Sequence, residues 1–188
     1  MTRLAILGSG NGTNAQRLCE YFSGHKDIII DCIIYNRKDA FIAQRAHNLG
    51  IEAQYFNKKD FYESSRVLDY LIERKIDYVI LAGFLLLIPQ NLLDQFPNRI
   101  INIHPSLLPK HGGSGMYGLK VHQEVIDSKE TKSGITIHII DNHYDRGPIL
   151  FQAECPVLDT DDAETLAQRV HQLEYQHFPV VIEKTILK

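Results

Sequence analysis

The chain has 188 residues, of which 44% are hydrophobic and 23% are charged, so one domain can bury a sizeable core without disulfide support. A formal net charge of −3 does not favour nucleic acid or an anionic membrane as a partner. The three cysteines, Cys19, Cys32 and Cys155, form no CxxC pair, which predicts buried free thiols and no metal site. Neither the N-terminus nor the longest apolar run suits a signal peptide or a membrane span, so we expect a cytoplasmic protein.

The first hundred residues alternate compact apolar runs with amphipathic segments. We expect Thr13 or Asn14 to cap the first helix and Gly50 to end the second. Strands that alternate with helices predict right-handed crossovers and an α/β fold, in which a mostly parallel sheet is flanked by helices on both faces. The predicted strands are residues 3–8, 27–36, 51–56, 77–83 and 99–103, and the predicted helices are residues 11–22, 39–50, 60–75 and 88–96.

The pattern changes after residue 118. A helix is predicted at 119–127, and the alternation in "SGITIHII" (133–140) predicts a half-buried strand. Residues 148–157 can return antiparallel to that strand. An amphipathic helix from about Ala163 to Ile186 closes the chain, and we expect it to be bent or broken at Pro179.

The glycine loop "GSGNGTN" (8–14) connects the first strand to the first helix, where backbone N–H groups and the helix dipole can hold an anion. It is not a Walker A loop, because no Lys-Ser/Thr follows, and the G-x-G-x-G spacing departs from the dinucleotide fingerprint. A tight turn that needs positive φ is the alternative explanation. Three glycines followed by Thr13 and Asn14 favour a small phosphate.

The strand 99–103 carries Asn102 and delivers His104 to the carboxyl edge of the sheet, where ligands bind in open α/β folds. Side chains two residues apart share one face of a strand, so the amide and the imidazole lie together. A single buried histidine is usually structural, but this pair leads into a long Gly/Pro loop that can cover a pocket. The amide can stabilise a developing oxyanion and the imidazole can move a proton.

A carboxylate near His104 would favour its imidazolium form. Asp141 and Asp145, in the loop between the two late strands, are both candidates, and the residues alone do not choose between them. Asp145 precedes Gly147-Pro148 and can sit in a rigid turn, whereas Asp141 can simply end the strand.

"NIHPSLLP" (102–109) together with "HIIDNHYDRGPI" (138–149) resembles the folate-dependent formyltransferases, and the similarity covers nearly the whole chain. The resemblance implies a Rossmann-like N-terminal half (1–100) that holds a phosphoribosyl substrate and a C-terminal half (101–188) for 10-formyltetrahydrofolate and catalysis. It places Asn102, His104 and Asp145 on the catalytic trio of the family.

Other positions match the binding residues of this family. Gly12, Thr13 and Asn14 match the phosphate site, and Glu174 matches an acidic residue that holds the glycyl amine of the substrate. The backbone of residues 85–88 matches the pterin-binding segment, although these side chains can also simply be core. The members of that segment are Leu85, Leu86, Leu87 and Ile88, and Asn102 is also expected to contact the folate. The resemblance implies no metal.

The chain departs from the family pattern in its longer glycine-rich loop (111–118), and Arg66 is out of register with an expected substrate-holding arginine. His138 is interpreted as structural support, whereas His111 and His143 stay undecided. The length and charge do not fit the tRNA-formylating or the folate-hydrolysing relatives. A sugar-nucleotide N-formyltransferase and a non-catalytic nucleotide-binding module remain as alternatives, and the oligomeric state, monomer or homodimer, stays open.

Overall fold

The computed structural model describes residues 1–143 and 145–188. The chain divides into two compact units, residues 1–101 with 186–188 and residues 102–185. The strands follow the order β3-β2-β1-β4-β5-β6-β7 in one seven-stranded sheet. The chain passes from the first unit into the second within β5 (Ile100–His104).

The first unit is built on parallel strands, as the alternating pattern predicts. β1 pairs in parallel with both β2 and β4, and β2 pairs in parallel with β3. The centre of this sheet is apolar on both faces, since Leu4 to Leu7 of β1 and Ile33 and Ile34 of β2 are fully buried. The bounds are β1 (Thr2–Gly8), β2 (Ile28–Tyr35), β3 (Glu52–Tyr55) and β4 (Tyr78–Leu81).

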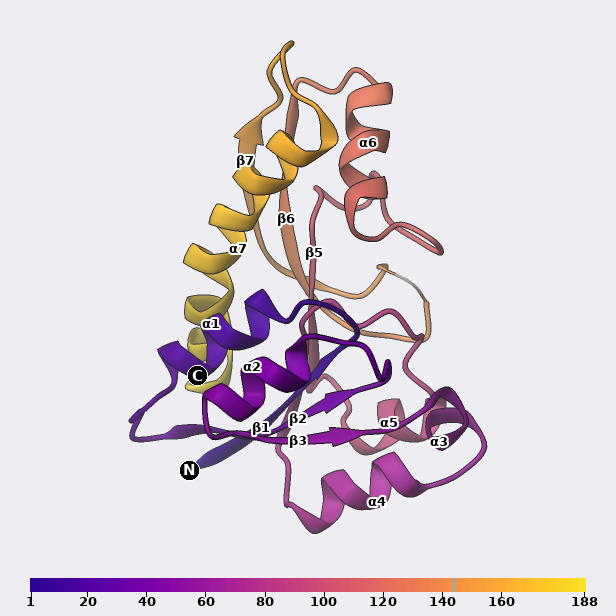
Figure 1. The fold of residues 1–188 in the computed structure, drawn as a ribbon, viewed down its shortest axis with the longest axis vertical. Coiled ribbons are helices and arrows are strands. Elements are labelled where there is room, and N and C mark those ends of the chain that lie inside the picture. Colours follow the sequence, from indigo (N-terminus) through magenta and orange to yellow (C-terminus); the bar gives the residue numbers. More distant parts are fainter. Residues whose placement is uncertain (144) are drawn as a thin grey trace. The chain divides into compact units, whose positions relative to one another are not determined.

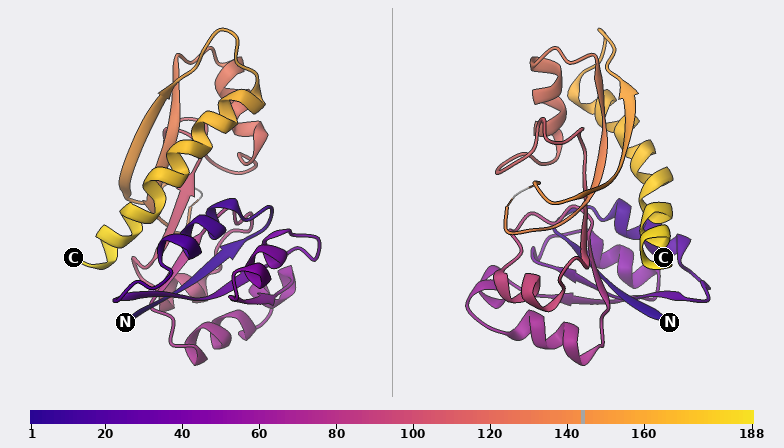
Figure 2. Two further views of the ribbon diagram at one scale, coloured as in Figure 1. Left: turned by 60° about the vertical axis from the view of Figure 1, so that its left-hand side comes forward. Right: turned by 180° about the vertical axis from the view of Figure 1, so that it is seen from behind.

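Helices cover both faces of these strands. Figures 1 and 2 show α1 and α2 on one face and α4 on the other. Gly50, at φ 68°, follows α2 at its predicted end. The helices of this unit are α1 (Thr13–Tyr21), α2 (Ile42–Asn48), α3 (Lys58–Tyr62), α4 (Arg66–Glu73) and α5 (Gln90–Gln95).

Two details of the predicted helices are wrong. The N-cap of α1 is Gly12, at φ 77°, so neither Thr13 nor Asn14 caps the helix. The predicted helix 60–75 is two helices, because the Ser64 hydroxyl donates to the Asp60 carbonyl over 3.0 Å just where α3 ends. The chain then turns through Ser65 before α4 begins.

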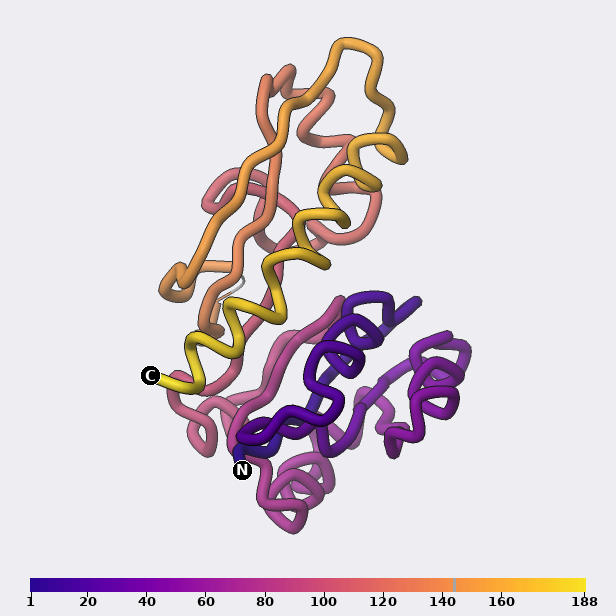
Figure 3. Tube along the Cα trace, turned by 90° about the vertical axis from the view of Figure 1, so that its left-hand side faces the viewer, coloured from indigo at the N-terminus to yellow at the C-terminus, as the bar shows by residue number. Residues whose placement is uncertain are grey.

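The second unit contains α6 (Leu119–Asp127), β6 (Lys132–Ile139), β7 (Ile149–Pro156) and nearly all of α7 (Ala163–Ile186). β6 and β7 pair antiparallel, as predicted. Figures 2 and 3 show α7 running obliquely along this hairpin, and the rings of Phe151 and His177 lie 4.9 Å apart between β7 and α7. The helix continues through Pro179, so of the expected bend or break, the break does not occur.

The expectation of a half-buried β6 is also wrong. Thr136 and His138 are as fully buried as Ile135 and Ile137. The polar side chains tolerate burial because each has hydrogen-bond partners, the Ser106 carbonyl for Thr136 and the Asn102 amide for His138. The polar face of β6 therefore lies against the segment 102–108.

All three cysteines are buried free thiols, as predicted. Burial raises the pKa of the Cys19 and Cys32 thiols to about 12, which keeps them protonated. Among the described residues, no helix is both long enough and apolar enough to cross a membrane.

Candidate functional site

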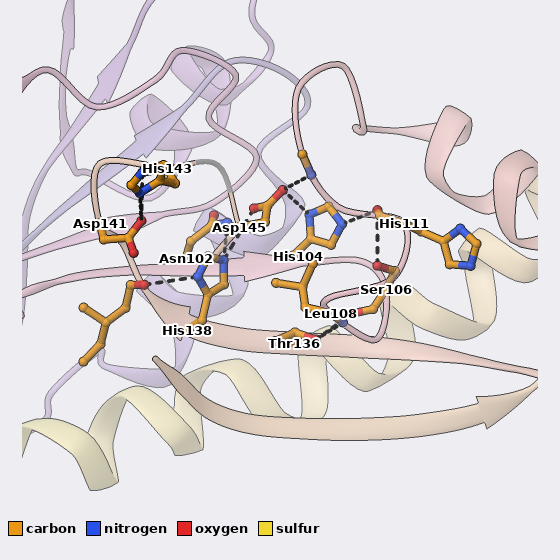
Figure 4. A network of polar contacts seen from close by, with 12 residues as sticks. Asn102, His104, Ser106, Leu108, His111, Thr136, His138, Asp141, His143 and Asp145 are labelled. Atoms are coloured by element: carbon orange, nitrogen blue, oxygen red, sulfur yellow. Dashed lines mark hydrogen bonds and ion pairs between the residues drawn. The ribbon is translucent and has the colours of Figure 1, made fainter. Parts of the chain in front are cut away.

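β5 carries the first two candidate catalytic residues. Ile101 and Ile103 are buried in the core, and the alternate positions hold Asn102, which is half-buried, and His104, which is 4% exposed. Figure 4 shows the two polar side chains with residues from the β6–β7 loop around them.

Asp145 lies beside His104. Its Oδ2 atom is 3.6 Å from His104 Nδ1 and accepts a hydrogen bond of 2.9 Å from the Gly113 backbone N–H. The backbone of Asp145 is left-handed, at φ 54°, and only 11% of its side chain is exposed. Gly112 permits this arrangement, because a Cβ there would lie 2.5 Å from Leu108 Cδ2 and 3.2 Å from Asp145 Cβ.

Asp141 has a different environment. Its Oδ1 atom accepts a 2.8 Å hydrogen bond from the His143 backbone N–H and lies 3.8 Å from His143 Nδ1. The His143 side chain is 67% exposed. The structure thus brings Asp145, and not Asp141, to His104, while the catalytic roles of the trio stay predictions.

His138 orients Asn102. The Asn102 Nδ2 group donates to His138 Nε2 over 3.1 Å, and His138 Nδ1 donates to the Ile139 carbonyl over 3.2 Å. His138 Nε2 also lies 3.6 Å from Asp145 Oδ1. Since an amide nitrogen carries two N–H groups, one is fixed by His138 and a second is available for another oxygen.

The electrostatics of the pair differ from the sequence expectation that Asp145 keeps His104 cationic. Burial lowers the pKa of His104 below its usual value, although the Asp145 carboxylate and the His111 carbonyl both act to raise it. For Asp145, burial acts to raise the pKa, but hydrogen bonding by His138, the electrostatic interaction with the His104 ring and the Gly113 N–H bring it below its usual range. His104 is therefore neutral at rest and Asp145 is ionised.

His111 enters the site through its backbone. The His104 Nε2 group donates a 2.9 Å hydrogen bond to the His111 carbonyl oxygen, while the His111 ring lies 3.5 Å from Glu130 Oε1. No sequence pattern indicates such a contact, because any residue supplies a carbonyl.

The glycine loop is shaped by its contacts with α2. The Ile42 backbone N–H donates to the Gly10 carbonyl over 3.1 Å, and a Cβ on Gly12 would lie 2.6 Å from Ile42 Cγ1. Thr13 and Asn14, both half-buried, begin α1 directly after this turn. The loop therefore presents a helix N-terminus next to a glycine that no other residue can replace without strain.

Arg45 of α2 holds the same loop and was not anticipated from the sequence. Its Nε group donates to the Asn11 carbonyl over 2.8 Å, and its Nη2 group donates to Asn11 Oδ1 over 2.9 Å. Arg66, by contrast, forms an ion pair with Asp60 and lies over the Phe56 ring. The guanidinium that contacts the glycine loop is thus that of Arg45.

The candidate pterin segment, residues 85–88, is irregular backbone after β4. The Leu85 N–H donates to Ser9 Oγ over 2.9 Å, and the Leu87 carbonyl accepts from the Tyr62 hydroxyl over 2.7 Å. Leu85 is 38% exposed, Leu86 and Leu87 are half-buried, and Ile88 is buried in the core. Internal contacts thus fix the segment, and its apolar edge stays accessible.

Glu174 lies on α7 and is only 5% exposed, and a carboxylate buried to this degree is almost always paired. The described residues contain no group of three or more His, Cys, Asp or Glu that is placed to hold a metal ion.

The Formyl transferase family model matches residues 2–182. Phosphoribosylglycinamide formyltransferase of Haemophilus influenzae is 34% identical over 97% of this chain and 86% of its own length. The chloroplastic phosphoribosylglycinamide formyltransferase of Vigna unguiculata is 43% identical over 96% of this chain, but this chain spans only 60% of that protein. The solved structure of phosphoribosylglycinamide formyltransferase from Bacillus halodurans is similar to this chain with a TM-score of 0.88 at 30% sequence identity. The match covers 100% of this chain and 96% of the Bacillus halodurans chain.

Proposed function

This chain belongs to the formyl transferase family, and we propose that it transfers a formyl group from 10-formyltetrahydrofolate to the amine of 5-phosphoribosylglycinamide, a step of de novo purine biosynthesis. The observation that carries the proposal is the buried contact between His104 and Asp145, with Asn102 on the same strand face. This constellation offers a proton acceptor and an amide donor but no covalent nucleophile, so it suits an attack by an amine of the substrate.

The glycine loop supports a phosphorylated substrate. Gly12 with Thr13 and Asn14 places backbone N–H groups and the positive end of α1 at one point, and Arg45 is held against the loop. We assign the phosphate to this loop and the glycyl amine to Glu174. Residues 1–100 would then hold the phosphoribosyl part and residues 101–188 the reacting groups.

The folate supplies the formyl group when it is bound. Leu85 to Ile88 fit one side of a pterin ring, since the exposed and half-buried leucines form an apolar edge whose backbone is fixed by Ser9 and Tyr62. We also assign the Asn102 amide to contact with the formyl group.

The proton chemistry follows from the state of His104. Because the Nε2–H group of His104 donates to the His111 carbonyl, Nδ1 is the nitrogen that can accept the proton of the attacking amine. The resulting imidazolium is stabilised by Asp145, and the free Asn102 N–H donates to the oxygen on which negative charge develops. His104 then releases its proton to the departing nitrogen.

Buried free thiols support a reducing compartment, and we propose the cytoplasm. We further propose that the protein acts on small molecules alone, as a monomer or a homodimer.

A turnover assay tests the function. The protein is given 10-formyltetrahydrofolate with either phosphoribosylglycinamide or an amino-sugar nucleotide, and the absorbance change of the folate is followed. We expect turnover with phosphoribosylglycinamide only. Turnover with the amino sugar would identify a sugar N-formyltransferase, and nucleotide binding by calorimetry without any turnover would identify a binding module.

A further inference from the structure

Ser9 joins the glycine loop (8–14) to the chain that follows β4. Its backbone N–H donates to the Gly83 carbonyl over 3.0 Å, and its Oγ accepts from the Leu85 N–H over 2.9 Å. Ser9 is only 1% exposed, so water does not compete for either hydrogen bond. One buried residue of the candidate phosphate site therefore holds the first residue of the candidate pterin segment (85–88), and both segments belong to the first unit.

These two hydrogen bonds continue the pairing of β1 and β4 beyond the ends of the strands. The paired register stops at Leu7 and Leu81, and the Ala82 N–H still donates to the Leu7 carbonyl over 2.9 Å. Gly83 then turns the chain with a φ of 72°, which ends the extended backbone. Beyond this turn the Ser9 hydroxyl replaces a backbone carbonyl as the acceptor, so the contact depends on the residue type at position 9.

The other side of the glycine loop is attached to α2. The Gly10 carbonyl accepts from the Ile42 N–H over 3.1 Å, and Arg45 Nε donates to the Asn11 carbonyl over 2.8 Å. Ser9 is the residue directly before this pair. A change in the backbone of the loop therefore displaces the Ser9 hydroxyl relative to its hydrogen-bond partner.

We propose that Ser9 is a positioning residue that couples the two candidate substrate sites, so that the phosphorylated acceptor and the folate each strengthen the binding of the other. An acceptor phosphate that orders the glycine loop also orders residues 85–88 through Ser9. The second ligand then loses less conformational entropy when it binds, and by thermodynamic linkage the effect is the same in either order of binding. This inference rests on the proposed function, which places the two ligands at these segments.

Tyr62 of α3 provides the matched comparison. Its hydroxyl donates to the Leu87 carbonyl over 2.7 Å, and this hydrogen bond attaches the same segment to α3 instead of the glycine loop. Ser9→Ala removes the Oγ acceptor and keeps the backbone hydrogen bond to Gly83, whereas Tyr62→Phe removes the hydroxyl and keeps the ring. Both variants loosen residues 85–88, but only Ser9→Ala separates them from the loop.

Calorimetry tests the coupling with tetrahydrofolate, which carries no formyl group to transfer. Its Kd is measured with and without saturating phosphoribosylglycinamide, and in the wild type we expect the acceptor to lower this Kd about fivefold. Tyr62→Phe should bind tetrahydrofolate more weakly but keep the ratio of the two Kd values, whereas in Ser9→Ala the ratio should fall to about one. A Ser9→Ala protein that keeps the wild-type ratio contradicts the proposal, because Ser9 would then only support the shape of the segment.

Hydrogen exchange of the Leu85 amide tests the same link in the wild type alone. Phosphoribosylglycinamide should slow this exchange about fivefold in the absence of any folate, because the acceptor of the Leu85 N–H is then held more firmly. An exchange rate that the acceptor leaves unchanged would contradict the coupling, even if Ser9→Ala did not fold.

The failure of this inference can be told from the failure of the proposed function. If the wild type transfers no formyl group and binds neither ligand, the proposed function is wrong and the coupling is wrong with it. If the wild type transfers the formyl group but binds the two ligands independently, only the coupling through Ser9 is wrong.

Discussion

His104 Nδ1 lies 3.6 Å from Asp145 Oδ2, and both side chains are almost entirely shielded from water. A carboxylate and an imidazole in such contact form a unit, in which the anion stabilises whatever positive charge the ring acquires. Burial opposes this effect and lowers the pKa of His104, so the ring is a base at rest and an acid only after it has taken up a proton.

The pH dependence of kcat/KM should reflect this balance. Because the neutral ring is the active form and its pKa lies below the ordinary 6.5, activity should fall as the pH falls, with a midpoint below 6.5. In Asp145→Asn the carboxylate that raises this pKa is lost, so the midpoint should move to still lower pH while the plateau rate falls. A midpoint that rises in Asp145→Asn would show that Asp145 does not act on His104 in this way.

His122 should make the protein sensitive to acid. It is 2% exposed, and burial, with His171 and His104 nearby, lowers its pKa from 6.5 to about 4. As the pH falls, His122 takes up a proton in the unfolded chain before it does so in the folded protein. The free energy of unfolding therefore decreases between pH 6.5 and about pH 4, by about 3 kcal/mol in total. Urea unfolding at pH 6.5 and at about pH 4 should show that His122→Leu loses less free energy of unfolding between the two pH values than the wild type, by about that amount.

The exposed His47 of α2 provides the control for this experiment. His47→Leu should lose as much stability between the two pH values as the wild type. If His122→Leu and the wild type lost the same amount of stability between the two pH values, His122 would not be the source of the acid sensitivity.

The glycine loop allows a matched pair of substitutions. Gly12→Ala places a Cβ 2.6 Å from Ile42 Cγ1 at a backbone φ of 77°, whereas a Cβ on Gly10 meets nothing within 4 Å. We expect Gly12→Ala to destabilise the protein by at least about 1 kcal/mol and to raise the KM for the phosphorylated substrate. Gly10→Ala should have a melting temperature close to that of the wild type. If Gly10→Ala and Gly12→Ala changed the melting temperature and the KM equally, a specific role for Gly12 would be excluded.

Arg45 offers a test of the proposed phosphate site that leaves the glycines of the loop intact. Arg45→Met keeps the apolar stem but removes the hydrogen bonds to Asn11 and the positive charge. The KM for the phosphorylated acceptor should rise several-fold and the KM for the folate should not change. A change in the folate KM alone would contradict the placement of the phosphate at this loop.

The strands of the fold could be predicted well, because central parallel strands are buried on both faces and appear as continuous apolar runs such as residues 3–8. The helix predicted at 119–127 has the observed bounds of α6. Two of the errors arose where side chains bond to the backbone. Ser64 ends α3 through such a bond, and Thr136 is buried through several, so the alternation in β6 did not report exposure.

The site was only partly predictable. Strand geometry placed Asn102 and His104 on one face, but the choice of Asp145 over Asp141 depended on the family resemblance, since both are carboxylates in one loop. The His111 carbonyl and the Arg45 contact were missed, the first because backbone atoms carry no residue signature. The Arg45 contact depends on how α2 packs against the glycine loop, and no motif in residues 39–50 indicates this packing.

His104 is the residue on which the proposed formyl transfer depends most, and the rate of formyl transfer by His104→Ala tests that role directly. With saturating 10-formyltetrahydrofolate and phosphoribosylglycinamide, and with folding checked by circular dichroism, we expect kcat to fall about a hundredfold or more. A His104→Ala protein that transfers the formyl group at nearly the wild-type rate would contradict the account.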